Sequence, residues 1–141
     1  DGEVLRQGLN RDLGFLGADR WENQRRAAEI ARLNLQQGIS TIIALVSPMA
    51  FERDDCRKLI GGDAYFEVFC DAPLEACEAR DKHGLYARAR AGEIANVTGV
   101  DAPYEAPKHP EVRLDTVADS VDTNLDKLLA ALRDKKILRQ P

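Results

Sequence analysis

The segment Ile39 to Val46, ISTIIALV, constrains the fold more than any other part of the sequence. It is an almost unbroken run of apolar and β-branched residues, and Ser47-Pro48 ends it. A strand in a one-sided sheet alternates polar and apolar residues, whereas a strand in a parallel sheet is covered on both faces and lacks that alternation. The run therefore predicts a buried strand in a parallel sheet, and with it an α/β protein.

Further strands and helices alternate along the chain. Strands are predicted at residues 65–70 and 112–115, and helices at 4–9, from Asp19 to Gln37, at 50–59, from Pro73 onward and after Ser120. In such α/β folds, ligands bind beyond the carboxyl ends of the strands. Four polar residues are expected at or just past such ends: Asp1, Ser47, Asp71 and Asp115.

Two signals set the bounds of the long helix between residues 19 and 37. Asp19 is expected to cap its start and Gly38 to stop it. Its predicted buried face carries Ala27, Ile30, Ala31 and Leu35.

Composition narrows the class of protein. The 141 residues suit one domain, and 44% hydrophobic with 31% charged residues is ordinary for a globular chain. The net charge of -4 argues against general nucleic-acid binding. No apolar run approaches the roughly 18 residues of a membrane-spanning helix, and no signal peptide is visible. Three cysteines without a Cys-x-x-Cys pair predict reduced thiols and a cytoplasmic location.

Residues 80–107 are expected to form a lid. The segment holds three glycines and two prolines, and only residues 85–94 could coil into a short helix. Connections longer than about 12 to 15 residues are uncommon unless they are functional. Four cations point to an anion beneath: Arg80, Lys82, Arg88 and Arg90. The alternative is a solvated loop whose charges only keep it soluble.

The first residues offer carboxylates and arginines for a phosphate site. Asp1 and Glu3 could hold magnesium through water or act as a general base, or they could form a solvated Asp-Gly turn. Arg6 and Arg20 could grip a phosphate or sulfate, or they could simply be solvated.

Two uncharged residues are also candidates. Phe15, between Gly14 and Gly17, could stack on a base or plug a minor core. The hydroxyl of Ser47 could meet a phosphoryl or hydroxyl group, or it could belong to an ordinary turn.

Other chemistries lack their motifs. His83 and His109 have no helix-spaced or carboxylate partners, so no metal-ligating residue is predicted. No Gly-x-Ser-x-Gly elbow is present, and no Gly-x-x-x-x-Gly-Lys-Ser/Thr loop forms a triphosphate cradle. The chain opens at Asp-Gly, which suggests a piece of a longer polypeptide.

Several segments in their order and spacing resemble the adenylylsulfate kinase family. They are DGEVLRQGLNRDLGF, ADRWENQRR, ALVSP, FEVFCDAPLEACEARDKHGLY and ARAGEIANVTGVDAPYEAP. The resemblance implies a three-layer P-loop nucleotide kinase fold with a mainly parallel sheet, missing its first strand and P-loop in residues 1–141. It implies transfer of the γ-phosphoryl of MgATP to the 3′-hydroxyl of adenylyl sulfate, giving 3′-phosphoadenylyl sulfate.

The same resemblance implies roles for particular residues. Asp1, Glu3 and Arg6 match an Asp-Gly-Asp-x-x-Arg motif, Phe15 matches an aromatic that stacks on the adenine of adenylyl sulfate, and Arg20 and Asn23 match an Arg-x-x-Asn that holds it. Asp1, Glu3 and Ser47 are the expected catalytic residues, and the serine has been proposed to carry a phosphoryl group in some members. Further substrate contacts are expected at Val46, Ser47, Lys82, Leu85, Asn96 and Val97, and ATP contacts at Arg80 and Thr116.

Two departures keep a second hypothesis open. Glu3 replaces an aspartate, in a site where a misplacement of about 1 Å can cost about 100-fold in rate, and the phosphate-binding loop is absent from these residues. The leading hypothesis is a kinase with Mg²⁺ and ATP, inactive as this segment alone. The alternative is a non-catalytic kinase-like module that regulates an attached ATP sulfurylase. Expected partners are ATP, adenylyl sulfate, a fused or associated ATP sulfurylase and further copies of the chain.

Overall fold

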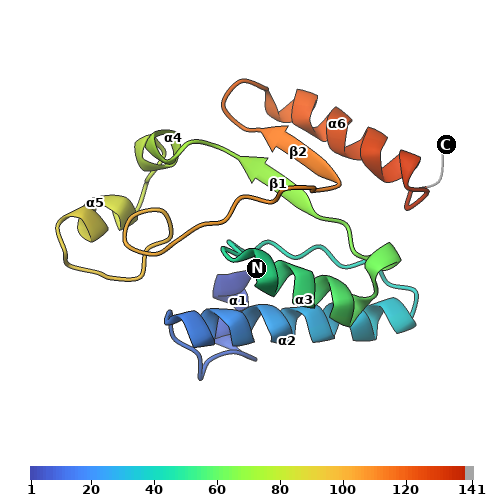
Figure 1. The fold of residues 1–141 in the computed structure, drawn as a ribbon, viewed down its shortest axis with the longest axis horizontal. Coiled ribbons are helices and arrows are strands. Elements are labelled where there is room, and N and C mark those ends of the chain that lie inside the picture. Colours follow the sequence, from blue (N-terminus) through green and yellow to red (C-terminus); the bar gives the residue numbers. More distant parts are fainter. Residues whose placement is uncertain (139–141) are drawn as a thin grey trace. The chain divides into compact units, whose positions relative to one another are not determined.

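The computed structural model describes residues 1–138 (Figure 1). They form two compact units. The first unit contains residues 1–65 and 101–106, and the second contains residues 66–100 and those from 107 onward. The expectation of one domain over residues 1–141, with a lid at 80–107, stays a prediction.

The first unit is helical. It contains α1 (Gly2–Gln7), α2 (Gly17–Gln36), α3 (Ala50–Ile60) and the short 3₁₀ helix η1 (Gly62–Ala64). The long helix α2 packs against both α1 and α3. Its buried positions include Ala27, Ala28 and Ala31, whose small side chains let a neighbouring helix approach closely. A buried hydrogen bond of 2.6 Å from Gln24 Nε2 to Glu52 Oε2 joins α2 to α3.

The start of α2 differs from the prediction. Leu16 is the N-terminal cap residue, and Asp19 lies in the first turn instead of capping it. An acidic side chain is still favourable there, because the helix dipole is positive at that end. Gly38, with φ +73°, ends the helix in the left-handed conformation as expected. Leu35 is 42% exposed, so the predicted buried face stops short of it.

The strand predicted at Ile39 to Val46 is not formed. Residues 39–49 carry no strand assignment, and Ile42 is 96% exposed. A strand exists only when a neighbouring backbone pairs with its N–H and C=O groups, and no segment within residues 1–138 pairs with this one. The prediction of a buried strand was wrong for these residues, and within the described part of the chain Ser47 does not follow a strand.

The second unit contains the parallel sheet. Strand β1 (Val68–Asp71) pairs in parallel with β2 (Val112–Asp115), so that Asp71 lies opposite Asp115. This confirms the α/β class and both predicted strands, although β1 begins three residues later than expected. Helix α6 (Val121–Asp134) packs on β2, and the Ser120 hydroxyl caps it by accepting from Thr123 N at 3.1 Å, as predicted.

Two short helices follow β1. They are α4 (Leu74–Ala79), which begins directly after Pro73, and α5 (Leu85–Arg90), which is the expected short helix of the predicted lid. Asp81 holds the start of α5, because its Oδ2 accepts from Tyr86 N at 2.8 Å.

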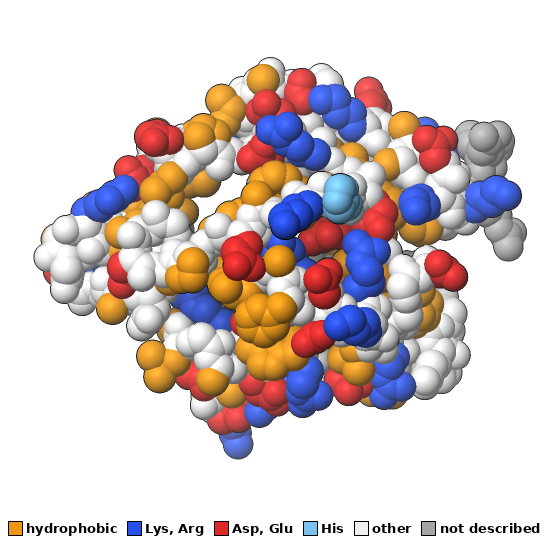
Figure 2. Space-filling view, viewed as in Figure 1, with side chains coloured by type: hydrophobic (Ala, Val, Ile, Leu, Met, Phe, Trp, Pro, Cys, Tyr) orange, Lys and Arg blue, Asp and Glu red, His pale blue; other side chains and the backbone are white. Residues whose placement is uncertain are grey.

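The visible surface is mixed in charge. On the face drawn in Figure 2, acidic and basic side chains are interspersed with apolar ones. No helix within residues 1–138 has both the length and the apolar character needed to cross a bilayer.

Candidate active site

Asp1 caps the amino end of α1. Its Oδ1 accepts from Glu3 N at 2.9 Å and Val4 N at 3.1 Å, which satisfies two of the unpaired N–H groups of the first turn. The cap explains why the helix begins at Gly2 and not at Val4 as predicted. Asp1 Oδ2 and the exposed Glu3 carboxylate make no hydrogen bond or ion pair with any described residue, so both can take a ligand.

Gly2 lies where three side chains meet. A Cβ atom at this position would lie 3.0 Å from Leu45 Cδ2, 3.4 Å from Arg6 Nη1 and 3.9 Å from Asn23 Nδ2. The absence of a side chain therefore lets α1, the extended segment after α2 and the side of α2 itself approach one another.

Arg6 and Arg20 surround the loop that carries Phe15. Arg6 donates to Gly14 O from Nε at 3.3 Å and from Nη2 at 3.1 Å, and its guanidinium carbon lies 4.5 Å from the centre of the Phe15 ring. Arg20 donates from Nε to Phe15 O at 2.9 Å, with its guanidinium carbon 6.0 Å from the same ring. Burial and the charge of Arg6 lower the pKa of Arg20 from its usual value.

Phe15 remains 61% exposed, which agrees with a ring on the surface and not with the alternative of a minor core plug. The two arginines hold the backbone on either side of the ring, so the loop presents an aromatic surface beside two cations. Such a surface suits a planar base attached to an anionic group.

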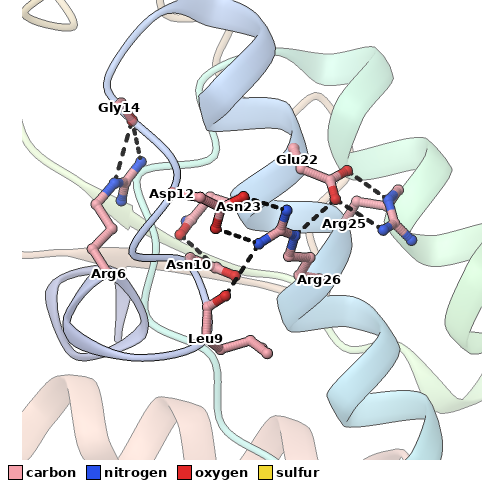
Figure 3. A network of polar contacts seen from close by, with 9 residues as sticks. All are labelled: Arg6, Leu9, Asn10, Asp12, Gly14, Glu22, Asn23, Arg25 and Arg26. Atoms are coloured by element: carbon pink, nitrogen blue, oxygen red, sulfur yellow. Dashed lines mark hydrogen bonds and ion pairs between the residues drawn. The ribbon is translucent and has the colours of Figure 1, made fainter.

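Asn23 lies on α2 and is only 3% exposed. Its Oδ1 accepts from Nδ2 of Asn10 at 2.9 Å (Figure 3). Asn10 itself is fully buried, in the turn that follows α1. The polar contact joins residues 13 positions apart, a spacing that no helical or strand pattern predicts.

A second cluster fastens the same loop to α2. Arg26 donates from Nη1 and Nη2 to the two oxygens of Asp12, both at 2.8 Å, and from Nη1 to Leu9 O at 3.1 Å (Figure 3). Glu22 accepts from Arg25 Nε at 2.7 Å and Arg26 Nε at 2.8 Å. These two hydrogen bonds lower the pKa of Glu22 to about 2.

Ser47 occupies a strained turn. Its φ is +44°, in the left-handed region that non-glycine residues seldom adopt. Its carbonyl accepts from Arg53 Nη1 at 2.8 Å, and Arg53 Nη2 donates to Glu105 O at 2.7 Å. Glu105 also accepts from Ala50 N at 2.7 Å through Oε2 and donates from its backbone N to Pro48 O at 2.8 Å.

These hydrogen bonds hold the turn in place, and the unfavourable φ of Ser47 can persist because they stabilise it. Neighbouring Val46 is 60% exposed, and the Ser47 hydroxyl makes no hydrogen bond with the described part of the chain. The hydroxyl of Ser47, which belongs to the first unit, is therefore available to hydrogen-bond with a ligand.

In the second unit, Arg80 and Thr116 are brought together. Arg80 donates from Nη2 to Thr116 O at 2.7 Å and from Nη1 to Thr116 Oγ1 at 3.2 Å. The Thr116 hydroxyl in turn donates to Asp71 O at 3.1 Å, which ties the pair to the carboxyl end of β1.

An open hollow of about 420 Å³ lies at the same ends of β1 and β2. Asp71 accepts from Arg113 Nε at 2.6 Å there, and the N–H groups of Ala118 and Val117 hold the pKa of the Asp115 carboxyl below its usual value. Asp71 and Asp115 thus stand at strand ends as predicted. The hollow is lined by Asp71, Ala72, Pro73, Arg113, Asp115, Val117 and Ala118.

The remaining predicted contacts lie in the second unit as well. Lys82 is exposed, and Leu85, the first residue of α5, is 46% exposed. Asn96 has φ +64°, and Val97 is buried at 7% exposure. Their roles stay predictions, as do those of the first-unit residues.

The first unit thus gathers four of the predicted residues, Arg6, Phe15, Arg20 and Asn23, around the starts of α1 and α2. Sequence reasoning missed Asn10, which holds Asn23. It also missed Arg53 and Glu105, which support the turn at Ser47. Asn10 and Glu105 lie inside the quoted segments DGEVLRQGLNRDLGF and ARAGEIANVTGVDAPYEAP, which was the signal that the sequence offered for them.

Comparison with known proteins identifies one family. Residues 1–115 match the sequence model described as adenylylsulphate kinase. The adenylyl-sulfate kinase of Marinobacter nauticus is 48% identical over 139 residues, which is 99% of this chain and 70% of that protein. The bifunctional enzyme NodQ of Azospirillum brasilense is 49% identical over 137 residues, which is 97% of this chain but only 22% of that protein.

A solved structure agrees with these relatives. The Mycobacterium tuberculosis APS kinase CysC, in complex with AMPPNP and APS, shares 48% sequence identity with a TM-score of 0.87. The match covers 94% of this chain and 78% of that one. The hexameric APS kinase from Thiobacillus denitrificans matches with 25% identity and a TM-score of 0.70 over 99% of this chain and 23% of its own length.

Proposed function

Because the chain belongs to the adenylylsulphate kinase family, we propose that the protein containing it transfers the γ-phosphoryl group of ATP to the 3′-hydroxyl of adenylyl sulfate. The product is 3′-phosphoadenylyl sulfate, and the protein is a phosphotransferase of sulfate activation with the P-loop kinase fold. The observation that carries the proposal is the cluster of Arg6, Phe15, Arg20 and Asn23. The alternative of a non-catalytic regulatory module is not favoured, because relatives named as kinases match nearly the whole chain.

The cluster suits the acceptor substrate. The exposed Phe15 ring offers a stacking face for adenine, and base stacking on an aromatic contributes about 1 to 3 kcal/mol. The guanidinium groups of Arg6 and Arg20 place two positive charges beside the ring, and phosphate and sulfate oxygens are favourable partners for such cations. Adenylyl sulfate contains a purine and an anhydride of phosphate and sulfate, and this cluster offers a binding surface for both.

The carboxylates of Asp1 and Glu3 fit a magnesium ion that accompanies ATP. Oδ2 of Asp1 and both oxygens of Glu3 are uncommitted within residues 1–138, and Mg²⁺ prefers oxygen ligands and keeps several of its waters. A magnesium ion held there would supply positive charge to offset that of the ATP phosphates. Asp1 and Glu3 would hold its waters, and either carboxylate could orient the acceptor hydroxyl.

Ser47 helps to position the acceptor in this proposal. Phosphoryl transfer is catalysed chiefly by alignment and charge neutralisation, so a direct in-line transfer needs no covalent enzyme intermediate. Val46, Lys82, Leu85, Asn96 and Val97 would add substrate contacts, and Arg80 with Thr116 would meet the adenine of ATP.

The wider setting is also proposed. Some relatives are bifunctional enzymes in which the matching part is a fifth of the length, which supports a fused or associated ATP sulfurylase here. The hexameric relative supports assembly with further copies of the chain. The free state of Cys56, Cys70 and Cys77 supports the reducing cytoplasm as location.

The test is turnover by the full-length protein with ATP, Mg²⁺ and adenylyl sulfate, followed as 3′-phosphoadenylyl sulfate and ADP in equal amounts. Binding of adenylyl sulfate and an ATP analogue without any turnover would favour the regulatory module and refute the kinase.

Arg20→Ala and Asn23→Ala test the acceptor cluster. Each should weaken adenylyl sulfate binding by about 10-fold or more, because a lost charge-assisted or buried hydrogen bond costs about 1.5 to 3 kcal/mol. ATP binding should change little. Arg32→Ala and Asn34→Ala are the matched controls, since both residues lie on α2 and their side chains hydrogen-bond to Glu29 and Thr41, respectively, outside the cluster. Calorimetric titration showing equal losses for the two nucleotides would contradict the assignment.

A further inference from the structure

Asn10 is the one large side chain buried below 2% exposure within residues 1–138. Its backbone is held on both sides, since its N–H donates to Leu5 O at 2.7 Å and its carbonyl accepts from Leu13 N at 3.0 Å. The side chain then has one polar contact, the hydrogen bond from Nδ2 to Oδ1 of Asn23 at 2.9 Å (Figure 3). Asn10 is thus a rigid, buried donor aimed at a residue of the acceptor cluster.

This contact decides which way the amide of Asn23 faces. A side-chain amide has a carbonyl end that accepts and an amino end that donates. With Oδ1 committed to Asn10, the amino group of Asn23 is left facing away from Asn10. It makes no hydrogen bond with any residue that the structure describes.

The free amino group lies beside a second donor. Asn23 Nδ2 and Arg6 Nη1 are 3.9 Å and 3.4 Å from the same point, the position that a Gly2 Cβ atom would occupy. Arg6 Nη1 uses one of its two hydrogens to donate to Gly2 O at 3.4 Å. Its other N–H and the amino group of Asn23 flank Gly2, an arrangement that suits an oxyanion. If the Asn23 amide were turned over, its carbonyl oxygen would face that anion and repel it.

The amide of Asn10 is not explained by its own hydrogen bonding. Its Oδ1 is buried without a partner among residues 1–138, and an unpaired buried acceptor is costly. An apolar residue of the same size would avoid that cost but would leave Oδ1 of Asn23 without its donor. The role of the Asn10 amide therefore lies in its amino end, which orients Asn23.

We propose that Asn10 is a positioning residue that holds the amide of Asn23 with its amino group toward the acceptor substrate, where it donates to an oxyanion oxygen of adenylyl sulfate beside Arg6. The inference rests on the proposed function and deepens it. It names Asn23 as a hydrogen-bond donor to the substrate and Asn10 as the group that prevents the opposite orientation.

The decisive variant is Asn10→Asp, which keeps the size of the side chain but can only accept when ionised. Asn23 must then turn over to donate to the new carboxylate, and it presents its own oxygen to the substrate. The dissociation constant and KM for adenylyl sulfate should rise at least about 10-fold, while the dissociation constant for an ATP analogue should stay within about 2-fold. Asn23→Asp, which keeps the bond from Asn10 but removes the donor, should lose adenylyl sulfate affinity by a similar factor.

A measurement on the wild-type protein covers the case in which Asn10→Asp does not fold. With ¹⁵N-labelled asparagine, the side-chain amino signals of Asn23, assigned by their absence in Asn23→Ala, should shift on saturation with adenylyl sulfate. They should not shift with the ATP analogue alone. Unshifted Asn23 signals in the saturated wild-type protein would overturn the proposal.

Failure of the positioning role of Asn10 can be distinguished from failure of the proposed function. If the wild-type protein turns over adenylyl sulfate and a folded Asn10→Asp variant binds it within about 2-fold of wild type, the positioning role is wrong and the proposed function stands. If the wild-type protein neither binds nor phosphorylates adenylyl sulfate, the proposed function fails and the role of Asn10 falls with it.

Discussion

Replacing Phe15 with alanine separates a binding role from a packing role. The ring is 61% exposed, so roughly two fifths of it is covered. A buried phenylalanine removes about 150 to 250 Å² from water, which puts the covered part here at roughly 60 to 100 Å². At about 25 cal/mol per Å² this is worth at most about 2.5 kcal/mol, and less against a compact unfolded chain. The contact with Arg6 adds about 0.5 to 1 kcal/mol.

The expected loss of stability is therefore about 2 kcal/mol, a shift of several degrees in Tm. Losing a stacked base should cost about 1 to 3 kcal/mol of binding, or roughly 5-fold to 150-fold in the Kd for adenylyl sulfate. The Kd for an ATP analogue should not change, because only adenylyl sulfate is proposed to use this ring. Isothermal titration measures both constants, and thermal denaturation measures Tm.

Phe51→Ala is the matched control. Phe51 is 55% exposed, lies in the same unit and has Trp21 as an aromatic neighbour, with ring centres 6.4 Å apart. Its replacement should lower Tm by a similar amount and leave both dissociation constants unchanged. A far larger fall in Tm for Phe15→Ala than for Phe51→Ala, or an unchanged affinity for adenylyl sulfate, would refute the reasoning.

Three further perturbations test other parts of the chain. Ser47→Ala should keep measurable turnover, because direct transfer needs no serine intermediate; complete loss of turnover in a folded variant would favour a phosphoserine. The folded pKa of Glu22, about 2, lies below the unfolded value of 4.5, so its stabilisation is present above about pH 4.5 and is lost as the pH falls toward 2. The Tm difference between wild type and Glu22→Gln should therefore shrink over that interval, and a constant difference would contradict the shift. Gly99→Ala should lower stability by more than Gly92→Ala in denaturant titrations: both glycines have positive φ, but only at Gly99 would a Cβ atom meet a side chain, 3.0 Å from Leu74 Cδ1. Equal losses would show that the contact is relieved by Leu74.

Much of the local structure could be predicted because its causes lie within a few residues. Gly38 ends α2 through a left-handed φ, and the Ser120 hydroxyl caps α6 three residues away. The apolar run at β1 predicted a strand, a short strand was predicted at residues 112–115, and the strand-end positions of Asp71 and Asp115 followed from both. The kinase family was likewise indicated by short segments, whose order is a property of the sequence alone.

The predictions that failed depended on partners. The run from Ile39 to Val46 has the composition of a buried strand, but pairing requires a neighbouring backbone, and none is found within residues 1–138. Asp1 caps α1 and thereby moves the helix start to Gly2, whereas Leu16 takes the cap position expected for Asp19. Propensity ranks such residues as caps but does not choose between neighbouring positions.

By itself, the sequence determined which residue types are present for phosphate chemistry and in what order, and it thereby specified the family. Only the tertiary structure decided how they are held. Asn10 orients Asn23 across 13 residues, and Glu105 reaches Ala50 across 55 to support the turn at Ser47. Such contacts follow no helical or strand period, because they depend on how the chain folds back on itself and not on the residues adjacent in sequence.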